Sequence, residues 1–259
     1  MITPIRFLSK TDNKADSVTP VLTTATVDAD FPLANLQHPF KTKTFRTDST
    51  ESDPLDLELT WDLGAANTVN CVFIVNHNLD SGGTFKLQGH TADSWGSPDV
   101  DETLTHNSGI IVKFFTGGSK RYWRLDLDNT SSAESFTEMG RVFFGSFYEV
   151  ERSFKVGWRD RAVDFSTRSQ TVGGQIHSDK QDTYRLLELD FSRITTAEKL
   201  NNLLPFVEDV QTTDFFMASL DIDNQLNAYT FYVKIERMPI LRDVIHTYAD
   251  FSITLREVL

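Results

Sequence analysis

Residues 55–61 read Leu-Asp-Leu-Glu-Leu-Thr-Trp, with every odd position apolar and every even position polar. A period of two puts one set of side chains on a buried face and the other on a solvent face, which is typical of a half-buried β-strand. Similar runs lie at 69–75, 84–88, 110–115, 122–127 and 141–147, separated by Gly-Ala-Ala-Asn, Asp-Ser-Gly-Gly, Thr-Gly-Gly-Ser and Asn-Thr-Ser-Ser. Because these separators are turn-forming, the pattern predicts a β-sandwich of short strands.

The pattern changes after residue 147. Residues 149–181 are polar without a sustained period, so we place a domain boundary near Val150 and expect domains at 1–150 and 151–259. Further strands are predicted at 184–191, 214–222, 229–236 and 249–257. Together these patterns predict a mainly β protein, in which a sandwich precedes a smaller β domain with one helix.

The single predicted helix begins with a capping box made by Thr195 and Glu198. Its apolar side chains recur at helical spacing and are Leu200, Leu203, Leu204 and Val207. Pro205 is expected to end or kink the helix, because proline lacks the N–H that a helix interior requires.

Strand phase also predicts which side chains are buried and which strand is free to pair. The expected sandwich core is Leu57, Leu59, Trp61, Val72, Ile74, Trp123, Leu125 and Phe143.

A small second sheet with open edges would be prone to aggregation in an isolated monomer. We therefore expect its terminal strand to pair with neighbouring copies in a closed ring, through Ala249, Phe251, Ile253 and Leu255.

Composition limits the classes of function. The chain has 25 basic and 37 acidic residues, a net charge of −12, so nucleic-acid phosphates would be repelled. There is no apolar run of about 18 residues and no basic leader followed by an apolar stretch, which predicts an unprocessed cytoplasmic product without membrane insertion. The single cysteine, Cys71, lies in an apolar run and is expected to be a buried small hydrophobe.

Motifs for catalysis are missing from the sequence. The six histidines lack the spacing of a helical metal site, no serine lies in a Gly-x-Ser-x-Gly elbow, and the glycine pairs at 82–83, 117–118 and 173–174 are expected to be hairpin turns. Carboxylates cluster at 28–30, 93–102 and 221–223, where solvated loops are favoured over calcium sites, although a bound cation stays open. We expect no catalytic residues, no cofactor and no enzymatic activity.

Three residues are candidates for ligand binding. Trp95 lies in a polar, acidic loop, where an indole suits sugar stacking and loop packing equally well. His77 follows a buried strand, and a hydrogen-bonded structural role is favoured there over a ligand contact. Arg124 is a third candidate, although it or Arg121 is expected to pair with an acid, such as Asp126 or Glu138.

A series of short motifs occurs in order between residues 25 and 148. They are Phe-Pro-Leu-Ala-Asn-Leu at 31–36, Phe-Arg-Thr at 45–47, Leu-Thr-Trp-Asp-Leu-Gly at 59–64, Lys-Arg-Tyr-Trp-Arg-Leu at 120–125 and Phe-Thr-Glu-Met-Gly-Arg-Val at 136–142. Their order resembles the discoidin family, also called the coagulation factor 5/8 C-terminal family, of galactose-binding-like jelly-roll sandwiches. The resemblance implies loops at one end that bind carbohydrate or lipid in many members, while the family's end-to-end cystine is absent.

The Asp-Phe-Pro-Leu-Ala-Asn-Leu opening at 30–36, followed by a compact β-rich domain, resembles bacteriophage tail proteins. The second domain is similar to the tail-tube-like fold of distal tail and hub proteins. This implies a homo-oligomeric ring in the virion tail tip or baseplate, with tube, hub and tape-measure proteins as partners and the sandwich pointing outward. The alternative is a carbohydrate-binding module that attaches to host glycans, and the sequence leaves the ring stoichiometry open.

Overall fold

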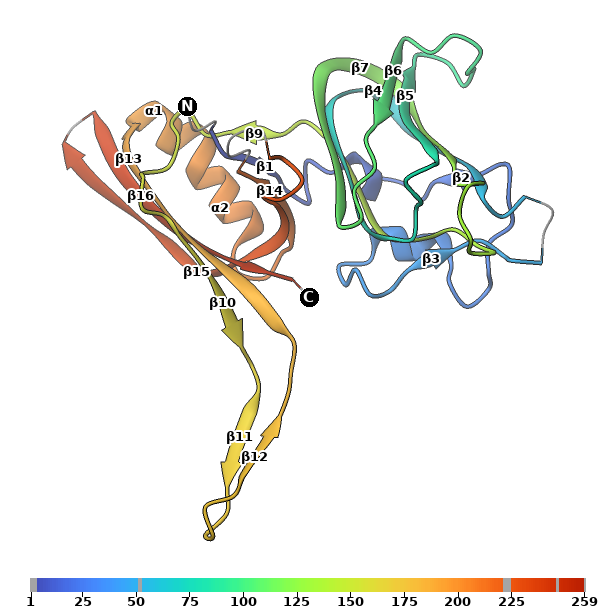
Figure 1. Ribbon diagram of the computed structural model, residues 1–259. Helices are drawn as coiled ribbons and strands as arrows, with labels where there is room; N and C mark the ends of the chain where they lie inside the picture. The colour runs from blue at the N-terminus through green and yellow to red at the C-terminus, as the bar shows by residue number, and fades with distance from the viewer. Residues whose placement is uncertain (1–3, 51–52, 221–224, 246, 259) are drawn as a thin grey trace.

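A computed structural model describes residues 4–50, 53–220, 225–245 and 247–258. Within these residues the chain forms two seven-stranded sheets and one separate two-stranded ribbon (Figure 1). The first sheet has the order β3-β8-β4-β7-β5-β6, with β2 added on β4. Its strands are β2 (Val21–Leu22), β3 (Phe45–Arg46), β4 (Asp56–His77), β5 (Thr84–His90), β6 (Val100–Leu104), β7 (Ile110–Asp128) and β8 (Glu138–Gly145).

The sandwich is built around two long strands that pass from one layer to the other. The first part of β4 pairs with the end of β7, and its last part pairs with both the start of β7 and β8. Each long strand joins two of the predicted short strands. Gly117 and Gly118 accordingly lie inside β7 beside a break in register, so their prediction as a hairpin turn is wrong. Glycine in a strand interior commonly marks such a bulge.

Seven of the eight predicted core residues form the sandwich core, and the eighth, Phe143, is buried outside it. All eight side chains expected to be buried are fully inaccessible to solvent. Trp61 and Trp123 both contact Phe144, with ring centroids 5.1 and 6.3 Å apart. Phe143, one residue before, points to the other side of β8 and joins a different cluster. The alternation of β8 thus supplies both the sandwich core and a second apolar surface.

The second sheet has the order β10-β13-β16-β15-β14-β1-β9. Its strands are β1 (Arg6–Leu8), β9 (Tyr148–Glu149), β10 (Arg159–Asp164), β13 (Thr183–Thr195), β14 (Phe216–Ser219), β15 (Thr230–Ile245) and β16 (Tyr248–Glu257). Strands β1 and β9 come from the segment predicted as the first domain. The sheets therefore do not follow the predicted division at residue 150, because the sandwich segment leaves the second sheet after β1 and returns to it at β9.

The terminal strand β16 lies in the middle of the second sheet. It pairs with β13 on one side and with β15 on the other. Ala249, Phe251, Ile253 and Leu255 are at most 2% exposed. The expectation that these residues form an open edge for other copies is corrected, because their backbone partners and their apolar contacts are supplied within the same chain.

One face of the second sheet is covered by a helical segment, formed by α1 (Thr196–Glu198), a π-helical turn (Lys199–Leu203) and α2 (Leu204–Val210). The Thr195 half of the predicted capping box is present, since the Thr195 hydroxyl accepts a hydrogen bond from the Glu198 N–H at 3.2 Å, while the Glu198 carboxylate accepts hydrogen bonds from Tyr148 and Asn202. The segment continues past Pro205. The wider turn before the proline shifts the apolar face onto Leu203, Phe206, Val207 and Val210, so Leu200, predicted on that face, is exposed.

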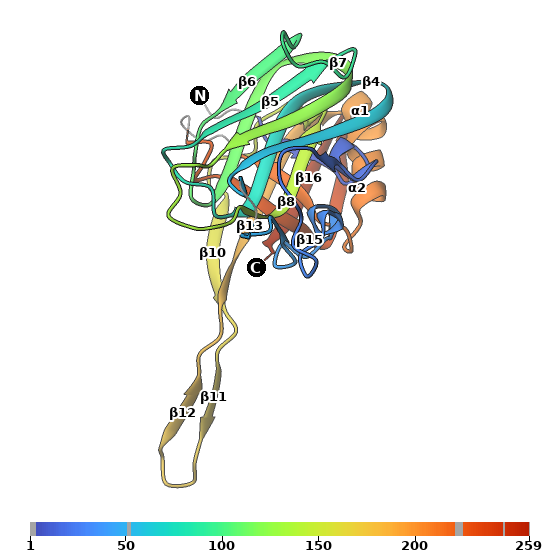
Figure 2. The same ribbon diagram turned by 90° about the vertical axis from the view of Figure 1, so that its right-hand side faces the viewer.

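The opposite face of the second sheet packs against the sandwich. Leu8, Met217 and Tyr232 lie in one buried cluster with five sandwich side chains, namely Cys71, Phe73, Val75, Val112 and Phe143. The Tyr232 hydroxyl also donates a hydrogen bond to the Pro39 carbonyl at 2.7 Å. Figure 2 shows the sandwich in front of the second sheet. The two halves are therefore joined by a shared apolar core as well as by the chain itself.

A long β-hairpin extends away from both sheets (Figures 1 and 2). It continues from β10 and β13 into the ribbon of β11 (Thr167–Gln170) and β12 (Ile176–Asp179), which pair only with each other. We call residues 159–183 the arm. Gly173 and Gly174 lie at its turn, as predicted.

Candidate functional site

Arg124 is the centre of a hydrogen-bonded network on the polar face of β4, β7 and β5. Its side chain is buried at 7% exposure. The guanidinium donates to Glu58 Oε1 at 2.6 Å and to Gln88 Oε1 at 3.0 and 2.7 Å, and it lies 3.8 Å from Asp126 Oδ2. The prediction that Arg124 pairs with an acid is confirmed, and charge-assisted bonds of this kind fix the guanidinium in one orientation.

The other predicted partners are arranged differently. Arg121 forms two hydrogen bonds of 2.7 Å with Asp62 at an exposed position. Glu138 pairs with Arg46 rather than with either predicted arginine.

Trp95 lies over the Arg124 guanidinium. The loop between β5 and β6 places the indole ring 4.8 Å from the guanidinium carbon, within the range of a cation–π contact. The indole Nε1–H donates to Asp93 Oδ1 at 2.9 Å, and the side chain is only partly buried. The structure thus brings together two of the three predicted binding residues and holds the partly exposed indole through both its ring face and its N–H.

A polar pocket of about 410 Å³ opens on the same strands. It is lined by Asp56, Thr84, Lys86, Asp126, Asp128 and Thr130. Burial, followed by repulsion from Asp128, raises the pKa of Asp56, and burial raises that of Asp126 against the opposing effect of Arg124. Two hydrogen bonds from Thr130 lower the pKa of Asp128. The pocket therefore presents carboxyl and hydroxyl oxygens together with the Lys86 ammonium.

His77 lies apart from this network. It pairs across the sheet with Met139 of β8, whereas Arg124 pairs with Thr60 and Gln88. Its Nδ1 accepts a hydrogen bond from the Leu79 N–H at 3.2 Å. Burial, with a smaller contribution from His106, lowers the pKa of His77 to about 4, so the imidazole is neutral near pH 7. These contacts match the structural role favoured for it.

Sequence reasoning missed the residues that complete the network. Glu58 occupies the polar phase of a strand whose apolar phase predicted part of the core, and Lys86 and Gln88 lie in the strand predicted at 84–88. Gln88 also donates to Asp101 Oδ1 of β6 at 3.1 Å. Strand β6 itself lies in the acidic stretch predicted as a solvated loop. The only available signal was the alternation, which shows which side chains share a face but not which strands are neighbours.

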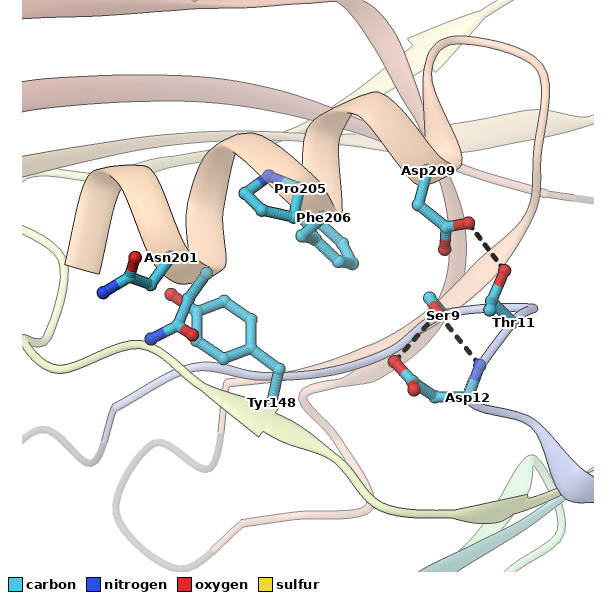
Figure 3. Close-up of a pocket in the computed structure, with 9 residues that line it drawn as sticks. Ser9, Thr11, Asp12, Tyr148, Asn201, Pro205, Phe206 and Asp209 are labelled. Atoms are coloured by element: carbon cyan, nitrogen blue, oxygen red, sulfur yellow. Dashed lines mark hydrogen bonds between the residues drawn. The ribbon is translucent and has the colours of Figure 1, made fainter. Parts of the chain in front are cut away.

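A second pocket, of about 360 Å³, lies between the helical segment and the chain that follows β1 (Figure 3). Its polar groups largely satisfy each other. Ser9 Oγ donates to Asp12 Oδ2 at 3.0 Å, and Thr11 Oγ1 donates to Asp209 Oδ1 at 2.6 Å. The Tyr148 hydroxyl donates to Glu198. These donors and acceptors are already paired within the chain, and none of the three predicted binding residues lines this pocket.

Cys71 is buried, and burial strongly raises the pKa of its thiol, as expected for a core residue. Within the described ranges, no group of three or more histidine, cysteine or carboxylate side chains is arranged to hold a metal ion. Among those same residues, no helix combines the length and apolarity needed to cross a membrane. The carboxylates at 221–223 lie outside the described residues.

Comparison with known proteins identifies similar folds only. No protein-family model and no curated protein sequence matches the chain. Solved structures similar to it include chitosan-binding module 1 of a chitosanase/glucanase from Paenibacillus sp. IK-5. The two sequences are 17% identical, the alignment covers 52% of this chain and 98% of the module, and the TM-score is 0.39. The family 32 carbohydrate-binding module of C. perfringens NanJ, in complex with galactose, is 11% identical over 55% and 99% of the two chains, with a TM-score of 0.41. The lectin domain of lectinolysin, complexed with Lewis B antigen, is 13% identical over 52% and 96%, with a TM-score of 0.41.

Proposed function

We propose that the sandwich binds carbohydrate on the face formed by Trp95, Arg124 and the adjoining polar pocket. The observation that carries this proposal is the partly exposed indole of Trp95, held over a buried arginine whose three nitrogens each donate a hydrogen bond, beside an oxygen-rich pocket. An aromatic ring surrounded by fixed hydrogen-bonding groups suits a ligand that is apolar on one face and polar at its edges.

The chemistry of the pocket suits sugar hydroxyls. Carboxylates such as Asp126 and Asp128 accept hydrogen bonds from hydroxyls, while Lys86 and Thr84 can donate to ring and hydroxyl oxygens. The network around Arg124 is already ordered before a ligand arrives, which reduces the entropy lost on binding. In this proposal Arg124 is a positioning residue for Trp95, because its own donors are taken by Glu58 and Gln88.

The test is calorimetric titration of the full chain with bacterial surface polysaccharides and with galactose- and glucosamine-containing oligosaccharides. We expect Trp95→Ala to weaken binding by roughly tenfold or more, the loss of one stacked ring. Phe40→Ala is the control, since Phe40 is an exposed aromatic side chain that lies outside this face. If no glycan binds, or if both variants bind like the wild type, the proposal is wrong.

A second proposal is a structural role in a bacteriophage tail tip, in which the second sheet assembles copies of the chain into a ring and carries the sandwich outside. The packing of the two halves through one buried cluster supports it, because a rigid joint lets an assembled sheet present the sandwich in a fixed direction. In this proposal the arm, which projects away from both sheets in Figure 1, contacts neighbouring copies. Proteomics of purified virions tests this role, and absence of the chain from the particles would overturn it.

A further inference from the structure

The arm has a surface that the rest of its own chain does not cover. Residues 167–183 are all exposed, and the ribbon of β11 and β12 has no third strand among the described residues. Isolated two-stranded hairpins are marginally stable in water. Two apolar side chains stand at the tip, where Val172 is fully exposed and Ile176 is 68% exposed. Packing against another surface would stabilise both the ribbon and these side chains.

A second exposed apolar surface lies on the hairpin formed by the end of β15 and the start of β16. Met238 is 51% exposed, Ile240 72% and Val244 54%. We call these three side chains the β15 patch. The first part of β15, from residue 230 to 235, is largely buried, whereas residues 236–244 are mostly exposed, so the strand changes from core to surface along its length.

The tip of the arm and the β15 patch lie toward opposite ends of the second sheet. Strand β13 begins in the arm at Thr183 and ends at Thr195, which pairs with Tyr248 beside the β15–β16 turn. Its 13 residues span roughly 40 Å at the usual rise of a strand. The arm also points away from the rest of the sheet in both views (Figures 1 and 2). The tip therefore cannot reach the β15 patch of its own copy.

We infer that the arm tip of one copy docks on the β15 patch of a second copy. The two surfaces differ, so the contact is head-to-tail, and repetition of such a contact gives a ring or an open filament. This inference rests on the assembly role proposed above and is independent of glycan binding. It specifies that the arm and the β15 patch, rather than the buried strand β16, make the contact.

Charge favours a second copy as the partner. Residues 159–183 contain four basic and four acidic residues, so the net charge of −12 lies entirely outside the arm. Residues 169–178, which form the tip, contain no Asp, Glu, Lys or Arg. An uncharged tip can approach an acidic copy without repulsion and can be buried without desolvating an ion.

The contact is tested by sedimentation velocity of the full chain across the micromolar range. The arm variant is Val172→Ser with Ile176→Ser, and the patch variant is Met238→Ser with Ile240→Ser. Each should raise the concentration at half-association by roughly tenfold or more, because each removes two apolar contacts. Val21→Ser is the control, since Val21 is an apolar residue on the sandwich that is 61% exposed, and its replacement should leave association unchanged.

Mixing the two variants tests the head-to-tail geometry. The arm variant keeps an intact β15 patch and the patch variant keeps an intact arm, so together they should form a dimer that cannot grow. Trypsin gives a second measure, because Arg168 and Lys180 flank the tip and should be protected only in the assembled state.

The possible outcomes distinguish failure of the assembly role from failure of the proposed contact. A wild-type chain that stays monomeric throughout this range would remove both the assembly role and the contact. An oligomer that neither variant weakens would remove the contact alone, as would a mixture that forms no dimer. If phosphatidylcholine vesicles bound the monomeric wild-type chain but not the arm variant, the tip would be assigned to a lipid surface and the inference would be overturned.

Discussion

Replacing Arg141 with methionine should destabilise the sandwich by about 3–5 kcal/mol at neutral pH. Arg141 is only 2% exposed. Its two terminal nitrogens each donate to Asp16 at 2.7 Å, and one also donates to the Leu36 carbonyl at 3.1 Å. Methionine fills a similar volume, so the expected loss comes from the carboxylate and the carbonyl left without their cationic partner rather than from a cavity.

The penalty should depend on pH in a defined direction. Burial raises the pKa of Asp16 even with Arg141 beside it, and removal of the cation should raise it further. When the folded-state pKa lies above the unfolded value, the folded protein gains stability as the pH falls through that folded-state pKa and the carboxyl takes up a proton. The cost of Arg141→Met is therefore fully present well above the folded-state pKa of Asp16 and shrinks as the pH approaches it.

The measurement is urea denaturation followed by tryptophan fluorescence at about pH 7 and about pH 4.5, with the Asp16→Asn, Arg141→Met double variant as the control. The double variant should recover much of the lost stability, because it removes the unpaired charge. A loss under about 1 kcal/mol at neutral pH, or a loss that does not change with pH, would show that the buried ion pair does not hold this region as argued.

Two further predictions concern the sandwich. Trp123→Ala should cost about 3–5 kcal/mol, because the side chain is fully buried against Phe144, and a wild-type unfolding midpoint would show that the packing is misassigned. The pKa of His77 is lowered from an ordinary 6.5 to about 4 in the folded protein. As the pH falls below the ordinary value, the unfolded chain binds a proton before the folded chain does, and acidification therefore destabilises the fold. Between about pH 7 and about pH 5 this linkage amounts to at most about 2 kcal/mol, and denaturation of His77→Gln across that range should show a correspondingly flatter profile. Equal slopes in the variant and the wild type would assign the pH dependence to other groups.

Local sequence determined the strands and the direction of their side chains. The alternation at 55–61 and in the other short runs reports burial directly, because successive residues of a strand face opposite sides whatever the strand pairs with. For the same reason the sandwich core and the cap at Thr195 could be predicted, since each depends on neighbours within a few residues. The same alternation placed the residues of the candidate site on the polar face of the strands, but it did not show which of these residues would lie together.

Tertiary structure alone decided which strands are neighbours. Alternation looks the same in a central strand and an edge strand, so β16 could be predicted as a strand but not placed between β13 and β15. The return of the chain to the second sheet at β9 depends on pairing with β1, far away in sequence. The contact of Trp95 with Arg124 likewise requires the β5–β6 loop to fold over β7. Each of these arrangements arises from contacts between distant segments, which a short window of sequence does not contain.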